Sequence, residues 1–250
     1  MSIINSFDES EEIVKAKTYT KGLKKLPETA IVCFKQELIE FIKQNKDFEE
    51  YSDMLVGGEK ITFYKTNVGQ KEVILYRTIM GAPTTVSMME EIHSRGVNKF
   101  IIFGSCGELT NNLKKGALII PTEAYRDEGT SYHYIPESDF IEVPTAKKLS
   151  EIFEKNNIEY QFTKTWTTDA LYRETVEKTK KRVEQGCDVV DMECSAIMAM
   201  AKLREIEAYQ FLYTDDSLTE DEWNVKTLAD DRTFFLKKCL EISLKVVEEI

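Results

Sequence analysis

The stretch from Cys187 to Arg204 most constrains how this chain folds. A short apolar segment that ends at Asp191 predicts a buried strand, and the Ala- and Met-rich segment after Glu193 predicts a helix. A strand that leads directly into a helix is the repeating unit of α/β folds. The same stretch brings the carboxylates of Asp191 and Glu193 to the carboxyl end of the strand, where α/β sheets usually bind ligands.

Strand and helix patterns alternate along the rest of the chain. Short segments rich in apolar, β-branched or aromatic residues predict strands at residues 29–34, 61–66, 73–79, 99–103, 117–121, 160–165, 188–191 and 208–213. Helical patterns cover residues 35–44, 84–95, 146–156, 193–204 and 229–249. The alternation predicts an α/β fold around a mostly parallel or mixed sheet, with no internal domain boundary.

Composition narrows the class of protein. The chain has 250 residues, 42% of them hydrophobic, and a net charge of −11, which argues against a general nucleic-acid binder. No apolar run approaches the roughly 20 residues of a membrane helix, and the polar first 12 residues contain no signal-peptide core. We therefore expect a cytoplasmic protein without nucleic-acid or membrane partners. Five scattered cysteines and two histidines favour neither a disulfide framework nor a metal site.

A second strand end carries a pair of acidic residues, Asp215 and Asp216. Carboxylates beside apolar neighbours are costly without a partner. Asp215 and Asp216, together with Glu193, suggest a site that binds hydroxyl groups and moves a proton. The structural alternative for Glu193 is a helix-start carboxylate stabilised by the helix dipole.

A glycine-bracketed serine follows the strand predicted at residues 99–103. Gly104 and Gly107 flank Ser105, so backbone N–H groups and a hydroxyl are open to an anion. No Gly-Lys-Ser/Thr follows, so the motif is not a P-loop. A tight strand-end turn is the structural alternative.

Three further motifs have both a functional and a structural interpretation. Residues 81–84, Gly-Ala-Pro-Thr, are typical of a helix start, which also binds anions. The polar loop at residues 126–134 would order a substrate or a subunit interface, or form a self-satisfied turn. The aromatic residues of segment 166–174 would stack on a planar base or pack at the rim of the site.

These motifs together resemble the nucleoside phosphorylase family, which includes uridine phosphorylase and the hexameric purine nucleoside phosphorylases. Methylthioadenosine nucleosidase is a related hydrolase. The resemblance runs in order from about residue 30 to the C-terminus, through segments 81–83, 103–107, 126–131, 168–172 and 191–193. It implies a single α/β domain over residues 1–250 with a twisted mixed central sheet flanked by helices, and residues 1–25 as an N-terminal extension or arm. It also implies a homodimer or a hexamer built as a trimer of dimers.

The resemblance also implies roles for individual residues. Glu193 would accept hydrogen bonds from the sugar, and Asp216, or Asp215 if the register differs by one, would protonate the leaving base. A buried carboxyl has a raised pKa, which suits a proton donor near neutral pH. The remaining substrate-binding residues would be Ser105, Gly104, Met192, Leu171, Tyr172, Trp166 and Arg126.

The chain departs from the family where phosphate binds. Ile102 and Leu38 stand at the positions of two family arginines, and a phosphate dianion is very unfavourable without fixed cations. Candidate cations that would replace these arginines in binding phosphate are Arg77, Lys35 and Lys60. Thr175 and Glu177 stand where uridine phosphorylases read uracil, which argues against uridine specificity.

Three functions remain open. The first is phosphorolysis of a purine or pyrimidine nucleoside to the free base and pentose 1-phosphate, with inorganic phosphate as co-substrate and no other cofactor. The second is hydrolysis of the same bond by water. The third is an inactive nucleoside-binding protein, which would have no need of an acid such as Asp216.

Overall fold

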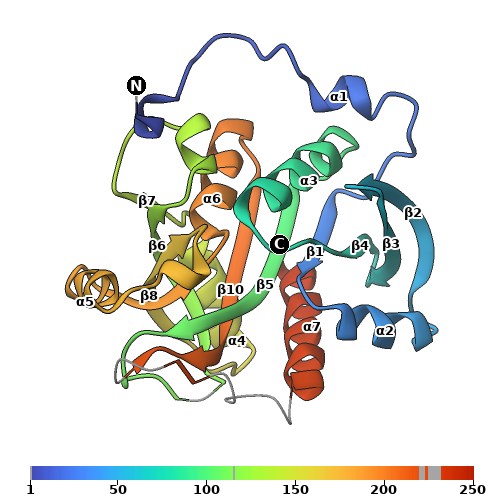
Figure 1. The fold of residues 1–250 in the computed structure, drawn as a ribbon. Helices are drawn as coiled ribbons and strands as arrows, with labels where there is room; N and C mark the ends of the chain where they lie inside the picture. Colours follow the sequence, from blue (N-terminus) through green and yellow to red (C-terminus); the bar gives the residue numbers. More distant parts are fainter. Residues whose placement is uncertain (1, 115, 220–222, 225–231) are drawn as a thin grey trace.

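The computed structural model describes residues 2–114, 116–219, 223–224 and 232–250 (Figure 1). Ten strands form one mixed sheet in the order β10-β6-β8-β9-β5-β1-β4-β3-β2, with β7 beside β6. The strands are β1 Thr29–Cys33, β2 Glu49–Val56, β3 Glu59–Val68, β4 Lys71–Arg77, β5 Lys99–Glu108, β6 Leu118–Asp127, β7 Phe140–Glu142, β8 Gln161–Thr168, β9 Cys187–Asp191 and β10 Glu207–Ser217. The predicted mixed α/β fold with a large central sheet is confirmed.

Helices pack around this sheet in two groups (Figure 1). α3 packs against α6, and α7 packs against α2 and α4. The helices are α1 Ala16–Tyr19, α2 Gln36–Gln44, α3 Ala82–Ser94, α4 Ala146–Lys155, α5 Val176–Glu184, α6 Cys194–Arg204 and α7 Arg232–Glu249, with short 3-10 turns η1 Ile3–Asn5, η2 Thr130–His133 and η3 Leu171–Arg173. Within the described ranges, no helix combines the length and apolarity that crossing a membrane requires.

β5 joins the two parts of the sheet. Its first half pairs in parallel with β1, and Gly107 and Glu108 at its end pair with β9. β10 runs parallel to β5 along the other edge, so β5, β10, β6, β8 and β9 form a closed ring of pairings. The ends of β1 and β9 therefore diverge beside residues 103–106 of β5. Such a switch point is where α/β sheets bind ligands.

Several strands are longer than predicted, which changes the setting of the motifs. The serine motif lies within β5, Arg126 lies within β6, and Trp166 lies within β8 rather than after it. Two acidic residues, Asp215 and Asp216, lie within β10. These motifs are therefore held by strand pairing rather than by free loops.

Four of the helices and strands were not predicted: α1, β2, α5 and β7. β2 is an edge strand whose residues are mostly exposed or half-buried, so it lacks the apolar pattern of a buried strand. It is connected to β3 by Gly57 and Gly58, both with positive φ, as a tight hairpin turn requires. The predicted start of the last helix, residues 229–231, lies outside the described residues.

The first residues run along the outside of the molecule (Figure 1). η1 contacts η2, and α1 packs against α3. Ile13 and Val14, between these two points, have exposed fractions of 98% and 91%. All five cysteines are buried with free thiols.

Candidate functional site

A cavity of about 320 Å³ opens at the point where β1 and β9 diverge along β5. Its walls come from the ends of β1, β9 and β10, from the last residues of β5, and from the segment around η3. The lining residues are Phe34, Lys35, Met80, Gly104, Ser105, Cys106, Gly107, Leu171, Glu174, Val190, Asp191, Met192, Glu193, Gln210, Leu212, Asp215, Asp216 and Trp223. The volume is within the range of small-molecule binding sites.

Asp191 fixes the start of α6. Its Oδ2 accepts hydrogen bonds from the backbone N–H groups of Glu193, at 2.9 Å, and Cys194, at 2.7 Å. Its Oδ1 accepts from the hydroxyls of Thr165, at 3.0 Å, and Thr167, at 2.8 Å. Both oxygens of this buried carboxyl therefore have partners from the protein itself, and Asp191 acts as a helix cap that orients Met192 and Glu193.

Glu193 lies in the wall of the cavity with an exposed fraction of 8%. Its Oε1 accepts a hydrogen bond from the backbone N–H of Gly81, at 2.6 Å. Gly81 has a φ of +112°, a backbone conformation that favours glycine, directly before α3. The helix start predicted to bind an anion therefore binds the Glu193 carboxyl. Burial raises the pKa of Glu193 to about 8, and the charge of Asp191 adds to the rise.

A second acidic group of the cavity lies at the end of β10. Burial raises the pKa of Asp216, and the neighbouring Asp215 contributes to the rise. The indole N–H of Trp223 donates to Asp216 Oδ2 at 2.6 Å. Glu174, which follows η3, also lines the cavity; burial first, and Asp216 second, raise its pKa to about 7. Glu174 therefore titrates near neutral pH, and Asp216 keeps its proton to a higher pH than an exposed aspartate would.

The cavity also contains an aromatic ring and further polar groups. An ideal Cβ built on Gly104 would lie 3.1 Å from Cδ2 of Phe34, so the ring packs directly against the glycine. Lys35 follows Phe34 and lines the same cavity. Gln210, on β10, has an exposed fraction of 1%, and its Oε1 has no hydrogen-bond partner within the described structure.

The cavity brings together most of the residues predicted for the site. These are Gly104, Ser105, Lys35, Leu171, Met192, Glu193, Asp215 and Asp216. Sequence reasoning did not single out Phe34, Glu174 or Gln210. Gln210 could have been found, because a polar side chain between Tyr209 and Phe211 in a buried strand requires a partner.

Arg126, predicted to bind substrate, does not line this cavity. It has an exposed fraction of 2%, and its guanidinium donates to Ser131 Oγ at 2.9 Å, to Ser138 Oγ at 2.9 Å and to the Pro136 carbonyl at 2.7 Å. The polar loop is therefore internally satisfied. It supports the site from behind, because Glu128 accepts a 2.9 Å hydrogen bond from the hydroxyl of Ser195 in α6.

Two aromatic residues predicted to contact the base lie elsewhere. Trp166 is completely buried, and its indole N–H donates to Asp127 Oδ2 at 3.0 Å. Tyr172 has an exposed fraction of 85% and meets the ring of Trp223 edge-on, with 6.5 Å between centroids. The two candidate cations Arg77 and Lys60 also lie outside the cavity lining, paired with Glu59 and Asp53 respectively.

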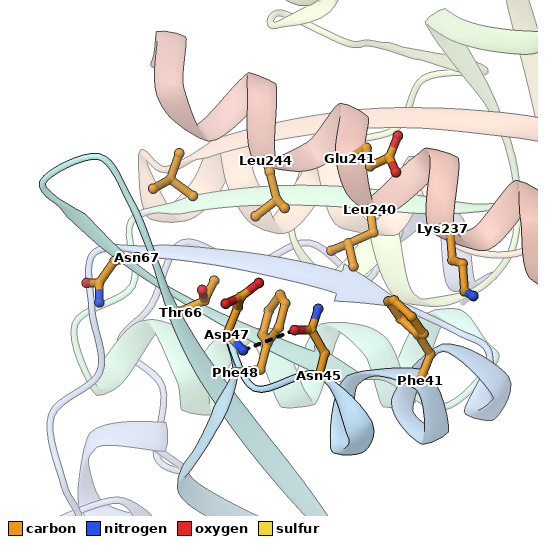
Figure 2. A pocket seen from close by; sticks show the side chains of 11 residues that line it. Phe41, Asn45, Asp47, Phe48, Thr66, Asn67, Lys237, Leu240, Glu241 and Leu244 are labelled. Carbon is orange, nitrogen blue, oxygen red and sulfur yellow. Dashed lines mark hydrogen bonds between the residues drawn. The ribbon is translucent and has the colours of Figure 1, made fainter.

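A second hollow, of about 570 Å³, lies between α2, β3 and α7 (Figure 2). Figure 2 shows the aromatic rings of Phe41 and Phe48 and the side chain of Leu240 toward it, with polar groups such as Asp47 and Glu241 around them. None of the residues predicted for the site lies here. Its lining offers a mixed surface without a buried acidic group, so we place the candidate site at the end of β5.

The sheet and its cavity define an α/β protein with an acidic cavity at a switch point. The chain belongs to the phosphorylase superfamily, whose sequence model matches residues 28–250. It is similar to the DeoD-type purine nucleoside phosphorylase of Bacillus cereus, at 28% identity over 180 residues (70% of this chain and 74% of the relative). The same enzyme type of Brevibacillus brevis is 27% identical, with the same two coverages. The crystal structure of the purine nucleoside phosphorylase of Toxoplasma gondii with immucillin-H has the same fold, with a TM-score of 0.75 and 21% identity over 88% of this chain and 90% of that one.

Proposed function

We propose that this chain cleaves the N-glycosidic bond of a nucleoside in the cavity at the end of β5. The observation that carries the proposal is the convergence of Ser105, Met192, Glu193 and Asp216 from three separate elements on one small cavity. Relatives named purine nucleoside phosphorylases support a purine nucleoside as the substrate.

Glu193 holds the pentose in this proposal. Its Oε1 is engaged by Gly81, which fixes the side chain, and its second oxygen serves the sugar hydroxyls. Met192 packs against the apolar side of the sugar ring. Such a carboxyl strengthens its hydrogen bonds as positive charge develops on the sugar in the oxocarbenium-like transition state.

Asp216 supplies the proton. Its raised pKa keeps a proton on the carboxyl at higher pH than an exposed aspartate would, so it can protonate the base as the C–N bond breaks. The indole N–H of Trp223 donates to Asp216 Oδ2 and fixes the orientation of the carboxyl. Leu171 and Trp223 offer apolar surface to the planar base.

Phosphate and water make different demands as acceptors of the pentose. Phosphorolysis, to pentose 1-phosphate, would rely on the Ser105 hydroxyl and on Lys35, the one lysine or arginine among the described lining residues. Hydrolysis requires no cation. Neither route calls for a further cofactor.

Release of free base from purified protein tests the proposal. A panel of purine and pyrimidine nucleosides is incubated with wild type and with Glu193→Ala, and the base is quantified chromatographically. We expect base release by wild type, with a higher KM and a lower rate in the variant because the sugar loses its partner. Binding of nucleosides without any release would favour an inactive binding protein.

Assembly and location are separate proposals. We propose a cytoplasmic homodimer or a hexamer built from dimers, with the segment up to residue 25 as a contact arm. The exposed apolar side chains of Ile13 and Val14 support such a contact. Light scattering of wild type and of an Ile13→Asp/Val14→Asp variant tests it, since an arm contact predicts a smaller species for the variant.

A further inference from the structure

Phe34 fills the part of the cavity next to the serine motif. The ring lies so close to Gly104 that a Cβ there would be 3.1 Å from Cδ2 and 3.2 Å from Cε2. The Phe34 ring therefore covers the backbone at Gly104, next to Ser105, and occupies space that a ligand of the serine motif would need. A tetrahedral dianion needs space and several donors at this point, whereas a water molecule needs room for one oxygen and two to four polar partners.

The cavity also offers a dianion few cationic partners. Five carboxyl groups line it, from Glu174, Asp191, Glu193, Asp215 and Asp216, against the single ammonium group of Lys35 among the described lining residues. Lys35 itself acts on Asp216, whose pKa it lowers against the larger effect of burial. Phosphate would enter an acidic, half-buried space with its main cation already near a carboxyl, which is electrostatically unfavourable.

The same cavity contains a polar partner for water. Gln210 on β10 is nine-tenths buried or more, lines the cavity and has no hydrogen-bond partner for its Oε1 in the described structure. A buried amide oxygen without a partner is costly unless a ligand or water supplies a donor. The Gln210 carbonyl oxygen can accept a hydrogen bond from water in this cavity, and the Ser105 hydroxyl, which also lines it, can donate one.

We infer that water, and not phosphate, accepts the pentose in this cavity. The inference rests on the proposed function and defines its reaction class as nucleoside hydrolysis. The oxygen of water bonds to C1 of the pentose while the C1–N bond breaks. The electron pair of the C1–N bond goes to the base nitrogen. Asp216 gives its proton to the base, and the proton lost by water restores the Asp216 carboxyl through the carboxyl groups that line the cavity.

The test identifies the sugar product in water enriched in ¹⁸O, with and without inorganic phosphate. We expect free pentose carrying ¹⁸O on C1 and a rate of base release that does not change when phosphate is added. Pentose 1-phosphate, with a rate that rises with phosphate concentration, would overturn the inference and leave the proposed function intact. Failure to release base from any nucleoside in either condition would overturn the proposed function and the inference together.

Lys35→Gln provides a second readout. If phosphate is the acceptor, removal of this ammonium group raises the KM for phosphate at least tenfold, because no other lysine or arginine of the described lining replaces it. If water is the acceptor, the variant and wild type both remain indifferent to phosphate, whatever their absolute rates. If phosphate raises the rate of the wild-type protein and does not raise the rate of Lys35→Gln, the result contradicts hydrolysis.

Discussion

Two polar clusters of this molecule contain similar residues but have different roles. The support cluster, Arg126, Glu128, Ser131 and Ser195, lies behind α6, and each of these side chains has hydrogen-bond partners within the protein. The site cluster, Glu174, Glu193, Gln210 and Asp216, faces the cavity, with raised carboxyl pKa values and a buried amide oxygen without a partner. Satisfied polar groups stabilise the fold, whereas groups left in need of a partner mark where a ligand binds.

The difference has consequences for stability. A carboxyl whose pKa is raised by burial is less stable in its ionised form in the folded protein than in the unfolded chain. The site cluster therefore lowers the free energy of unfolding at neutral pH, and the support cluster raises it. Substitutions in the site cluster should therefore mainly lower activity, and substitutions in the support cluster should mainly lower stability.

Asp216→Asn should give the largest effect. The amide keeps the shape and the hydrogen bond from Trp223 but cannot donate a carboxyl proton to the base, so we expect kcat to fall by about 10² to 10⁴. KM should change little, since the sugar contacts remain. Steady-state kinetics on the best nucleoside of the panel measures both. Asp215→Asn is the matched control, and a larger loss in that variant would assign the proton to Asp215.

Glu193→Gln should reduce kcat/KM by about 10², since an amide that cannot ionise replaces a carboxyl whose ionised form stabilises developing positive charge on the sugar. Gln retains an oxygen for the Gly81 N–H, so the local fold should survive. Kinetics and far-UV circular dichroism of the same preparation separate lost chemistry from lost structure. Unaltered kinetics would remove Glu193 from the site.

Arg126→Met should cause the largest loss of stability, about 3 kcal/mol, because several buried acceptors lose a charged donor. Urea unfolding measures the change, and Arg126→Lys, which keeps the charge but not the planar fork, should be intermediate. KM of the folded fraction should stay near the wild-type value. A KM effect without a stability loss would return Arg126 to substrate binding.

The acidic residues of the site could be predicted because strand ends and helix starts are recognised from a few consecutive residues. Glu193, Asp216 and Ser105 each follow or end an apolar segment, and all three line the cavity. The partners that shape the cavity were not predictable in this way. Phe34 packs on Gly104, and Gln210 faces the cavity, because of how β1, β5 and β10 are placed in the sheet, which depends on residues far apart in the chain.

The same reason explains the misplaced aromatic residue. β8 continues to Thr168 instead of ending near residue 165, so Trp166 occupies a paired strand position in the core. A strand's end is the least certain feature of a sequence pattern, and a slip of a few residues moves a side chain between rim and interior. The edge strand β2 was missed because its polar sequence lacks the apolar alternation of a half-buried strand.

The pH dependence of unfolding should differ between wild type and Glu193→Gln. The pKa of Glu193 is raised from 4.5 to about 8, so the folded state binds more protons than the unfolded state between these values. Stability from this group is therefore present at acidic pH and is lost as the pH rises towards 8. Urea unfolding from pH 5 to 8 should show wild type losing stability relative to Glu193→Gln. Parallel curves for the two proteins would mean that the carboxyl titrates normally.

Trp166→Phe should give the smallest effect and the sharpest separation of the two interpretations of this residue. The variant loses the indole hydrogen bond to Asp127 and some core volume, which together cost about 1 to 2 kcal/mol. Because the ring lies outside the cavity lining, KM for the nucleoside should stay within about twofold of wild type, a free-energy change well under 1 kcal/mol. Urea unfolding and steady-state kinetics on one preparation give both numbers. A higher KM with unchanged stability would instead mean that the indole stacks on the base, and that the cavity extends behind β8.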